Sequence, residues 1–197
     1  MSVWLKVCGL TDQRAVDAAL DAGVQAIGFV FATSPRRIEP DHARALKEHI
    51  DGRAEVIAVM RHPKQTLVDD VLRVVAPDVL QTDYEDLQAL RIPKTQRTLS
   101  VLRGTGRPVP MPARVLFEGA ASGAGELSDW EQARGLAADT ELILAGGLSP
   151  DNVAAAIARV QPFGVDVSSG VESQRGVKDV EKIYAFAQAV RSAAAQD

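Results

Sequence analysis

Short apolar runs alternate with longer amphipathic segments along most of the chain. The runs are rich in β-branched and aliphatic residues and are continuous, which is typical of strands that are covered on both faces. Eight strands are predicted in this way, at residues 3–8, 26–31, 55–60, 79–80, 98–102, 115–117, 142–145 and 165–167.

Helices are predicted in most of the intervals, because apolar residues recur there at helical spacing and capping residues precede them. Thr11 is expected to cap the first helix, and Pro40 and Pro63 to open the second and third. Further helices are expected to start at or near Asp83, Ser128, Ser149 (with Pro150 in the first helical position) and Val177. Residues 104–112 contain three prolines and two glycines, so no regular helix is expected after the fifth strand.

Strands that alternate with helices at about 16 to 30 residues per unit predict a parallel sheet, and eight strands are the number that closes a (β/α)8, or TIM, barrel. The chain is short for this fold, so its loops must be short. An open doubly wound sheet is the alternative, but the G-x-G-x-x-G turn usual in that fold is absent after the first strand. We therefore expect a single barrel domain over residues 1–197, with the fifth helix degenerate or absent.

Composition narrows the class of protein further. The chain has 197 residues, of which 46% are hydrophobic, and its net charge of −4 gives no reason to expect a nucleic-acid partner. No apolar run approaches the roughly 18 residues of a membrane helix, and the N-terminus does not fit a signal peptide. A single cysteine favours a reducing compartment. We expect a cytoplasmic protein that binds neither nucleic acid nor membrane.

The last two predicted strands run into turns of small residues. Gly146 and Gly147 follow the seventh strand, and Ser168, Ser169 and Gly170 follow the eighth. Such turns let an anion approach backbone N–H groups, and barrels often build a phosphate site from these two loops. We therefore expect these five residues to hold a phosphate. The alternative is that the glycines only close tight turns.

Reacting groups in such a barrel lie at the C-terminal ends of the strands. Cys8 ends the first strand, with Lys6 two residues earlier on the same face. A thiol becomes a useful base when its neighbours stabilise the thiolate, and the alternative is that Cys8 is a small buried hydrophobe. Glu118 follows the apolar run 115–117, where partial desolvation suits a carboxyl group to donate a proton.

The other polar groups at strand ends are Arg36, His62, Gln81, Asp83 and Asp166. The three histidines are scattered and no ligand spacing is present, so no metal is expected. A base, an acid and a phosphate site together predict a proton-transfer enzyme that acts on a sugar phosphate.

Longer motifs resemble the phosphoribosylanthranilate isomerase family of tryptophan biosynthesis; they cover residues 6–11, 26–31, 34–36, 144–153, 165–172 and 176–179. The resemblance implies a (β/α)8 barrel that converts N-(5-phosphoribosyl)anthranilate to 1-(2-carboxyphenylamino)-1-deoxyribulose 5-phosphate without a cofactor. It implies that Cys8 takes a proton from C2 of the ribose and that Glu118 protonates the ring oxygen. Arg36 matches an arginine that engages the substrate, through its anthranilate carboxylate. Lys6 and Asp166 are expected to contact the substrate as well.

The middle of the chain departs from the family pattern. Glu118 stands where the family has aspartate, Asp83 stands where it has histidine, and residues 122–125 replace a Gly-Gly-Thr-Gly loop. Two other functions therefore stay open, a different sugar-phosphate isomerase and a catalytically weak paralogue that binds a phosphorylated ligand. The role of His62 also stays open, and a monomer or a homodimer is expected.

Overall fold

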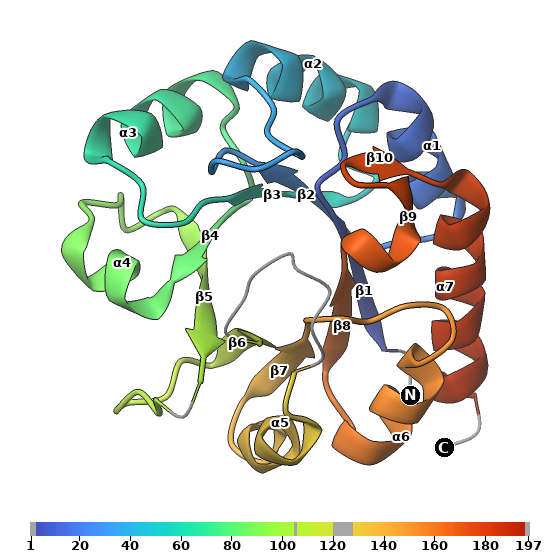
Figure 1. Cartoon of the computed structure of the whole chain (residues 1–197). Coiled ribbons are helices and arrows are strands. Elements are labelled where there is room, and N and C mark those ends of the chain that lie inside the picture. The colour runs from blue at the N-terminus through green and yellow to red at the C-terminus, as the bar shows by residue number, and fades with distance from the viewer. Residues whose placement is uncertain (1–2, 105, 120–127, 196–197) are drawn as a thin grey trace.

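Eight parallel strands close into a barrel in a computed structural model that describes residues 3–104, 106–119 and 128–195. Each strand pairs with the next along the chain, and the last pairs with the first (Figure 1). The strands are β1 (Trp4–Cys8), β2 (Ala26–Val30), β3 (Glu55–Val59), β4 (Val79–Asp83), β5 (Arg97–Arg103), β6 (Arg114–Glu118), β7 (Glu141–Leu144) and β8 (Gly164–Val167). The closed sheet confirms the predicted (β/α)8 barrel and excludes the open doubly wound sheet.

Helices surround the barrel on its outside (Figure 1). They are α1 (Gln13–Asp21), α2 (Pro40–Ile50), α3 (Gln65–Val74), α4 (Tyr84–Ala89), α5 (Trp130–Ala137), α6 (Val153–Val160) and α7 (Val180–Ala194). No described residue between β5 and β6 is helical, as the prolines predict. The loop at residues 122–125, where the sequence departs from the family pattern, lies outside the described residues.

An additional antiparallel ribbon, which the sequence did not predict, lies between β8 and α7. It consists of β9 (Glu172–Gln174) and β10 (Val177–Lys178), and the short 3₁₀ helix η1 (Ser169–Val171) leads into it. The ribbon places Glu172 and Lys178 above the C-terminal end of the barrel, close to the predicted phosphate turns.

Several helix starts differ from the prediction because another residue occupies the N-cap position. Asp12, not Thr11, caps α1, and its carboxylate accepts from the Ala15 N–H at 2.9 Å. The helix after β7 begins at Val153 with Asn152 as its N-cap, so Ser149 does not cap it.

Two more starts shift by one or two residues. Asp129, rather than Ser128, caps α5, with its carboxylate accepting from the N–H groups of Glu131 and Gln132. The third helix begins at Gln65, two residues after Pro63. Prediction therefore located the helices correctly and their first turns less well.

The core has two layers, because successive residues of each strand point to opposite faces of the sheet. Outward-facing residues such as Ile27, Phe29 and Leu80 pack against the helices. Inward-facing residues fill the barrel with a second cluster: Ala26, Ile57, Val79, Leu99, Val101, Leu116, Ile143 and Ala145. Toward the C-terminal ends the same inward positions become polar, so the apolar filling supports a charged mouth. Among the described residues, no helix is long and apolar enough to cross a membrane.

Candidate active site

A cavity of about 140 Å³ opens at the C-terminal ends of the strands. Its walls bring together five of the residues predicted from the sequence: Cys8, Arg36, Glu118, Asp166 and Ser168. Gln81, Arg61 and Arg103 also line it. The predicted base and acid therefore face one space, although 110 positions separate them in the sequence.

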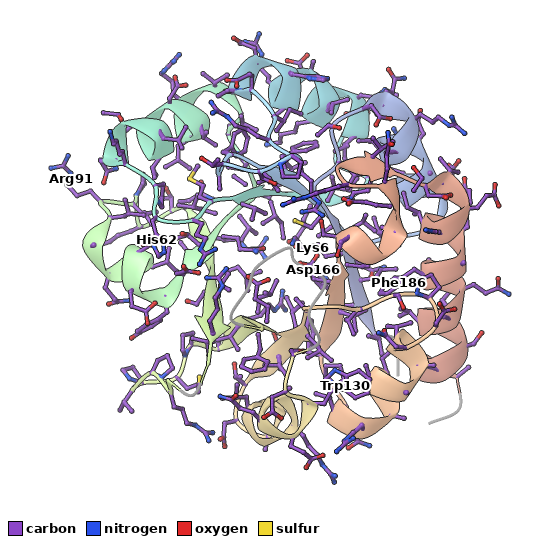
Figure 2. All side chains as sticks on the ribbon, viewed as in Figure 1. Lys6, His62, Arg91, Trp130, Asp166 and Phe186 are labelled. Carbon is purple, nitrogen blue, oxygen red and sulfur yellow. The ribbon has the colours of Figure 1, made fainter. Side chains whose placement is uncertain are left out.

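Lys6 and Asp166 form an ion pair beneath Cys8, at the centre of the barrel (Figure 2). The two residues are direct neighbours in the β1–β8 register, and Lys6 Nζ lies 3.0 Å from Asp166 Oδ1. Lys6 is completely buried and, unlike Asp166, does not line the cavity. Burial alone would lower the pKa of Lys6, but the Asp166 carboxylate and the Cys8 sulfur outweigh it and raise that pKa above its ordinary value. Lys6 therefore carries its positive charge inside the barrel wall.

Cys8 sits above this pair and is almost completely buried. Burial raises the pKa of the Cys8 thiol above its ordinary value, and the positive charge of Lys6 opposes this shift without cancelling it. A Cβ atom at Gly28 would lie 2.9 Å from Cys8 Sγ and 3.1 Å from Lys6 Cε. Glycine in β2 is therefore what leaves space for both side chains.

Arg36 is held in place by Glu172 of the ribbon. Arg36 Nε and an Nη donate to the two Glu172 oxygens at 2.6 Å and 3.0 Å, and Lys178 Nζ donates to Glu172 Oε1 at 3.0 Å. Burial would raise the pKa of Glu172, but the hydrogen bonds from Arg36 and Gly176 and the charge of Lys178 lower it to about 2. Glu172 and Lys178 lie in the motifs noted in the sequence, but no pattern marked them as members of the site.

The two predicted phosphate turns contact each other. Gly146 and Gly147 have positive φ angles of 87° and 65°, a conformation that favours glycine. A Cβ atom at Gly170 would lie 1.9 Å from the carbonyl oxygen of Leu148, so the turn after β8 packs directly on the turn after β7. Asn152 fixes the turn after β7, because it accepts from the Ser149 N–H and donates to the Gly147 carbonyl, each at 2.9 Å.

Ser168 and Ser169 complete this region next to Cys8. The Ser168 hydroxyl donates to the Cys8 carbonyl at 3.0 Å, and Lys178 Nζ donates to the Ser168 carbonyl at 2.8 Å. Ser169 begins the 3₁₀ helix and is only partly buried. The structure therefore brings all five predicted residues into one small-residue surface with a lysine beside it.

On the opposite side of the mouth, Arg103 forms ion pairs with both Asp83 and Glu118. The three side chains come from the ends of β5, β4 and β6, and their exposed fractions are only 17%, 8% and 13%. Sequence reasoning missed Arg103. The alternation Leu99-Val101-Arg103 was the available signal, because it places the arginine on the inward face of the strand.

His62 lies outside the cavity but near this group. Its side chain is 68% exposed, and its Nε2 lies 3.7 Å from Asp83. In the described part of the chain, His62, Asp83 and Asp86 form one group whose ligand-type atoms lie within 4.8 Å of one another. Asp86 already accepts hydrogen bonds from His62 and Thr82, which together lower its pKa although burial would raise it. Asp86 is therefore already engaged by His62 and Thr82, and Asp83 pairs with Arg103, while the absence of a metal stays a prediction.

Comparison with known proteins connects this geometry to one family. A family model for N-(5'-phosphoribosyl)anthranilate (PRA) isomerase matches residues 5–189. An N-(5'-phosphoribosyl)anthranilate isomerase from Rhizobium etli (strain CIAT 652) is 36% identical over 209 residues, covering 96% of this chain and 94% of that protein. The matched residues include every strand end that lines the cavity.

Solved structures agree with this match. The crystal structure of TrpF from Jonesia denitrificans superposes with a TM-score of 0.81 at 34% identity and covers 100% of both chains. A phosphoribosyl anthranilate isomerase in complex with reduced 1-(o-carboxyphenylamino)-1-deoxyribulose 5-phosphate superposes with a TM-score of 0.78 at 25% identity, over 96% of this chain and 99% of that one. The similarity therefore extends over the whole barrel.

Proposed function

The chain belongs to the N-(5'-phosphoribosyl)anthranilate isomerase family, and from this premise we propose that it catalyses the rearrangement of N-(5-phosphoribosyl)anthranilate in tryptophan biosynthesis. The observation that carries the proposal is that Cys8 and Glu118, from β1 and β6, line the same cavity. A thiol and a carboxyl group on different sides of one small space can act on two atoms of a single sugar.

Glu118 acts first in the proposed reaction. It donates a proton to the ring oxygen of the ribose, the bond from that oxygen to C1 breaks, and the anthranilate nitrogen forms a double bond to C1. Cys8 in its thiolate form then removes the proton from C2. The electron pair of the C2–H bond forms a double bond between C1 and C2, and the π electrons of the C1–N double bond move onto nitrogen and neutralise the iminium. The resulting enol-amine gains a proton at C1 and loses one from its hydroxyl group, which gives the amino-ketone product. No electron leaves the substrate, so no cofactor is required.

Substrate binding is assigned to the groups around these two residues. Gly146, Gly147 and the turn 168–170 hold the phosphate through backbone N–H groups and hydroxyls, supported by the charge of Lys178. Arg36 binds the anthranilate carboxylate, and its pairing with Glu172 fixes the direction of the guanidinium.

Asp166 contacts the sugar from the cavity wall beside Cys8. Lys6 does not line that cavity, so we assign it an effect on the substrate through Asp166 and Cys8. The protein acts on this small phosphorylated molecule as a monomer or a homodimer, which sedimentation distinguishes.

A second candidate function is a catalytically weak paralogue that binds a phosphorylated ligand. The departures from the family pattern at Asp83 and Glu118, which both pair with Arg103, favour it. Another sugar-phosphate isomerase is less well supported, since the family match extends over residues 5–189. Growth of a tryptophan auxotroph that lacks the isomerase separates an active enzyme from a binding protein.

The direct test is steady-state turnover of freshly generated phosphoribosylanthranilate, followed through the loss of its fluorescence with a metal chelator present. We expect turnover in the wild type and losses of about 10²- to 10⁴-fold in Cys8→Ser and Glu118→Gln, with folding and binding of a product analogue retained. Glu131→Gln, which changes an exposed glutamate of α5, is the matched control and keeps full activity. A folded wild type that binds the analogue without turnover would establish the weak paralogue instead.

A further inference from the structure

We propose that Arg103 is a positioning residue, whose guanidinium bridges Asp83 and Glu118 and holds the Glu118 carboxyl group in the cavity that faces Cys8. The inference rests on the proposed function, since it gives Arg103 a role only through the acid. It assigns a task to a residue that the reaction itself does not require.

Strand register places Arg103 between the two carboxylates. Arg103 lies directly opposite Glu118 in the β5–β6 pairing. On the other side, Asp83 lies opposite Val101, which is two residues before Arg103 and therefore on the same inward face. One Nη of Arg103 pairs with Asp83 and the other with Glu118. The two arms of a single planar fork thus set the separation of two acidic groups.

Low exposure makes this bridge stronger than a surface ion pair. The Arg103 side chain is 17% exposed, and those of Asp83 and Glu118 are less exposed still. Attraction between partly buried charges is screened much less than attraction in water. Without the guanidinium, two carboxylates on neighbouring inward positions would repel each other, and the flexible Glu118 side chain would lose its fixed direction.

Arg103 also separates two cavities. The cavity that contains Cys8 and Glu118 shares Val101 and Arg103 with a second cavity of about 260 Å³, which Asp83 and Arg107 line. Arg103 is therefore part of the wall between them. Shortening this side chain would let the Glu118 side chain turn away from Cys8 toward the second cavity. The direction of the acid would then change, while the residues that contact the substrate would stay in place.

Other charged groups act on Glu118 as well, and the test has to keep them constant. Cys8 and Asp166 interact electrostatically with Glu118, and Lys6 and Lys178 act in turn on these two residues. Asp83 shares Arg103 with Glu118, and His62 lies beside Asp83. In the described part of the chain, none of these six residues forms an ion pair with Glu118, whereas Arg103 does. Substitutions at Arg103 therefore change the direct partner and leave the pair on the β1–β8 side intact.

The experiment compares Arg103→Met, Arg103→Lys, Glu118→Gln and the double variant Arg103→Met with Glu118→Gln, each assayed for kcat and KM. We expect Arg103→Met to lower kcat about 10²-fold and to change KM less than about threefold, because a misplaced acid impairs chemistry more than binding. Arg103→Lys should recover part of kcat, since lysine keeps the positive charge but lacks the planar fork whose two arms point at the two carboxylates. Arg97→Met is the matched control, because Arg97 pairs with Glu55 at the other end of the same strand.

The double variant gives the sharpest result. If Arg103 acts through Glu118, removing both costs no more than removing Glu118 alone, whereas an independent structural effect multiplies the two losses. Multiplied losses, or a rise in KM with kcat unchanged, would overturn the inference while Glu118→Gln still reports the acid. A fully active Glu118→Gln would overturn both the role of the acid and the inference. A folded wild type without turnover would overturn the proposed function itself, and the inference with it.

Discussion

Two groups of opposite charges lie on opposite sides of the barrel mouth, and they are built differently. On the β1–β8 side, Lys6 pairs with Asp166 one to one and is completely buried. On the β4–β6 side, a single Arg103 serves both Asp83 and Glu118 and stays partly exposed to the cavity. In the first group Lys6 is shielded from the substrate space and only Asp166 lines it, whereas Arg103 and Glu118 of the second group both line that space.

The β1–β8 pair supports the base, whereas the β4–β6 group contains residues that differ from the family pattern. The β1–β8 pair lies directly beneath Cys8, and Gly28 leaves no spare volume around it, so it holds the base in one position. The β4–β6 group contains two of the three departures from the family pattern, Asp83 and Glu118. Arg103 bridges these two positions, so the altered residues lie in one contact network.

Removing Lys6 is expected to have the largest effect on the free energy of unfolding. Comparing it with the removal of Arg103 shows which charged group contributes more to stability. Lys6→Met leaves Asp166 buried without a partner, and breaking a buried pair in this way typically destabilises a protein by about 3–5 kcal/mol. Arg103→Met should cost less, because the Arg103 side chain is 17% exposed, whereas the Lys6 side chain is completely buried. Urea unfolding measures both, and Lys6→Met combined with Asp166→Asn should regain part of the loss. Equal losses of unfolding free energy in Lys6→Met and Arg103→Met would show that the two charged groups do not differ in their contribution to stability.

Adding one methyl group at Gly28 tests how closely the β1 side is packed. The Cβ of Gly28→Ala would lie 2.9 Å from Cys8 Sγ, so the thiol must move. We expect kcat to fall about 10²-fold, the size of effect that a displacement of about 1 Å can produce. Gly135→Ala is the control, because nothing lies within 4 Å of that position in α5, and it should leave kcat unchanged.

The pH dependence of Cys8 shows which charged group acts on the base. Burial raises the pKa of the thiol above its ordinary value of 9.0, so the thiolate fraction should rise about tenfold per pH unit between about pH 6 and about pH 8. Lys6→Met should raise this pKa further, because Lys6 is the largest opposing influence. Alkylation of the single cysteine, measured by mass spectrometry, reports the thiolate without an activity assay. If the pKa of Cys8 shifted more in Arg103→Met than in Lys6→Met, the β4–β6 group and not the β1–β8 pair would control the base.

The smallest expected effect is on stability at low pH, and it concerns Glu172 in the ribbon that follows β8. The pKa of Glu172 is about 2 in the folded protein against an ordinary value of 4.5, so its stabilising contribution is present above pH 4.5 and is lost as the pH falls toward 2. We expect it to amount to about 1–2 kcal/mol. Glu172→Gln should therefore be less stable at neutral pH and show a flatter decline in acid, followed by thermal unfolding. An unchanged decline would show that Arg36 and Lys178 do not stabilise the ionised form.

Prediction from the sequence succeeded where the signal is local. Continuous apolar runs identify strands, and eight of them in alternation with helices indicate a closed barrel. Three prolines within residues 104–112 exclude a helix there by the same local reasoning. The rule that strand ends carry the chemistry brought Cys8, Arg36 and Glu118 together correctly in one cavity.

Prediction failed where a residue's role depends on its neighbours in space. Asn152 competes with Ser149 for the start of α6, and only the folded turn decides between them. Glu172 follows the eighth strand in an unremarked ribbon, and its contact with Arg36 joins residues 136 positions apart. Neither the start of α6 nor the contact between Glu172 and Arg36 produces a periodic pattern in the sequence.

The amino-acid sequence by itself therefore determined the order of the elements, the barrel and the residues that its strand ends present, because those properties follow from hydrophobic period and strand count. Only the tertiary structure decided how the charges are shared. Which acids the inward-facing Arg103 bridges depends on the register of β5 between β4 and β6. Whether Lys6 contacts substrate or supports Cys8 depends on its register with Asp166 across the closing pair of strands. Register is fixed by packing over the whole barrel, so no local stretch of sequence contains it.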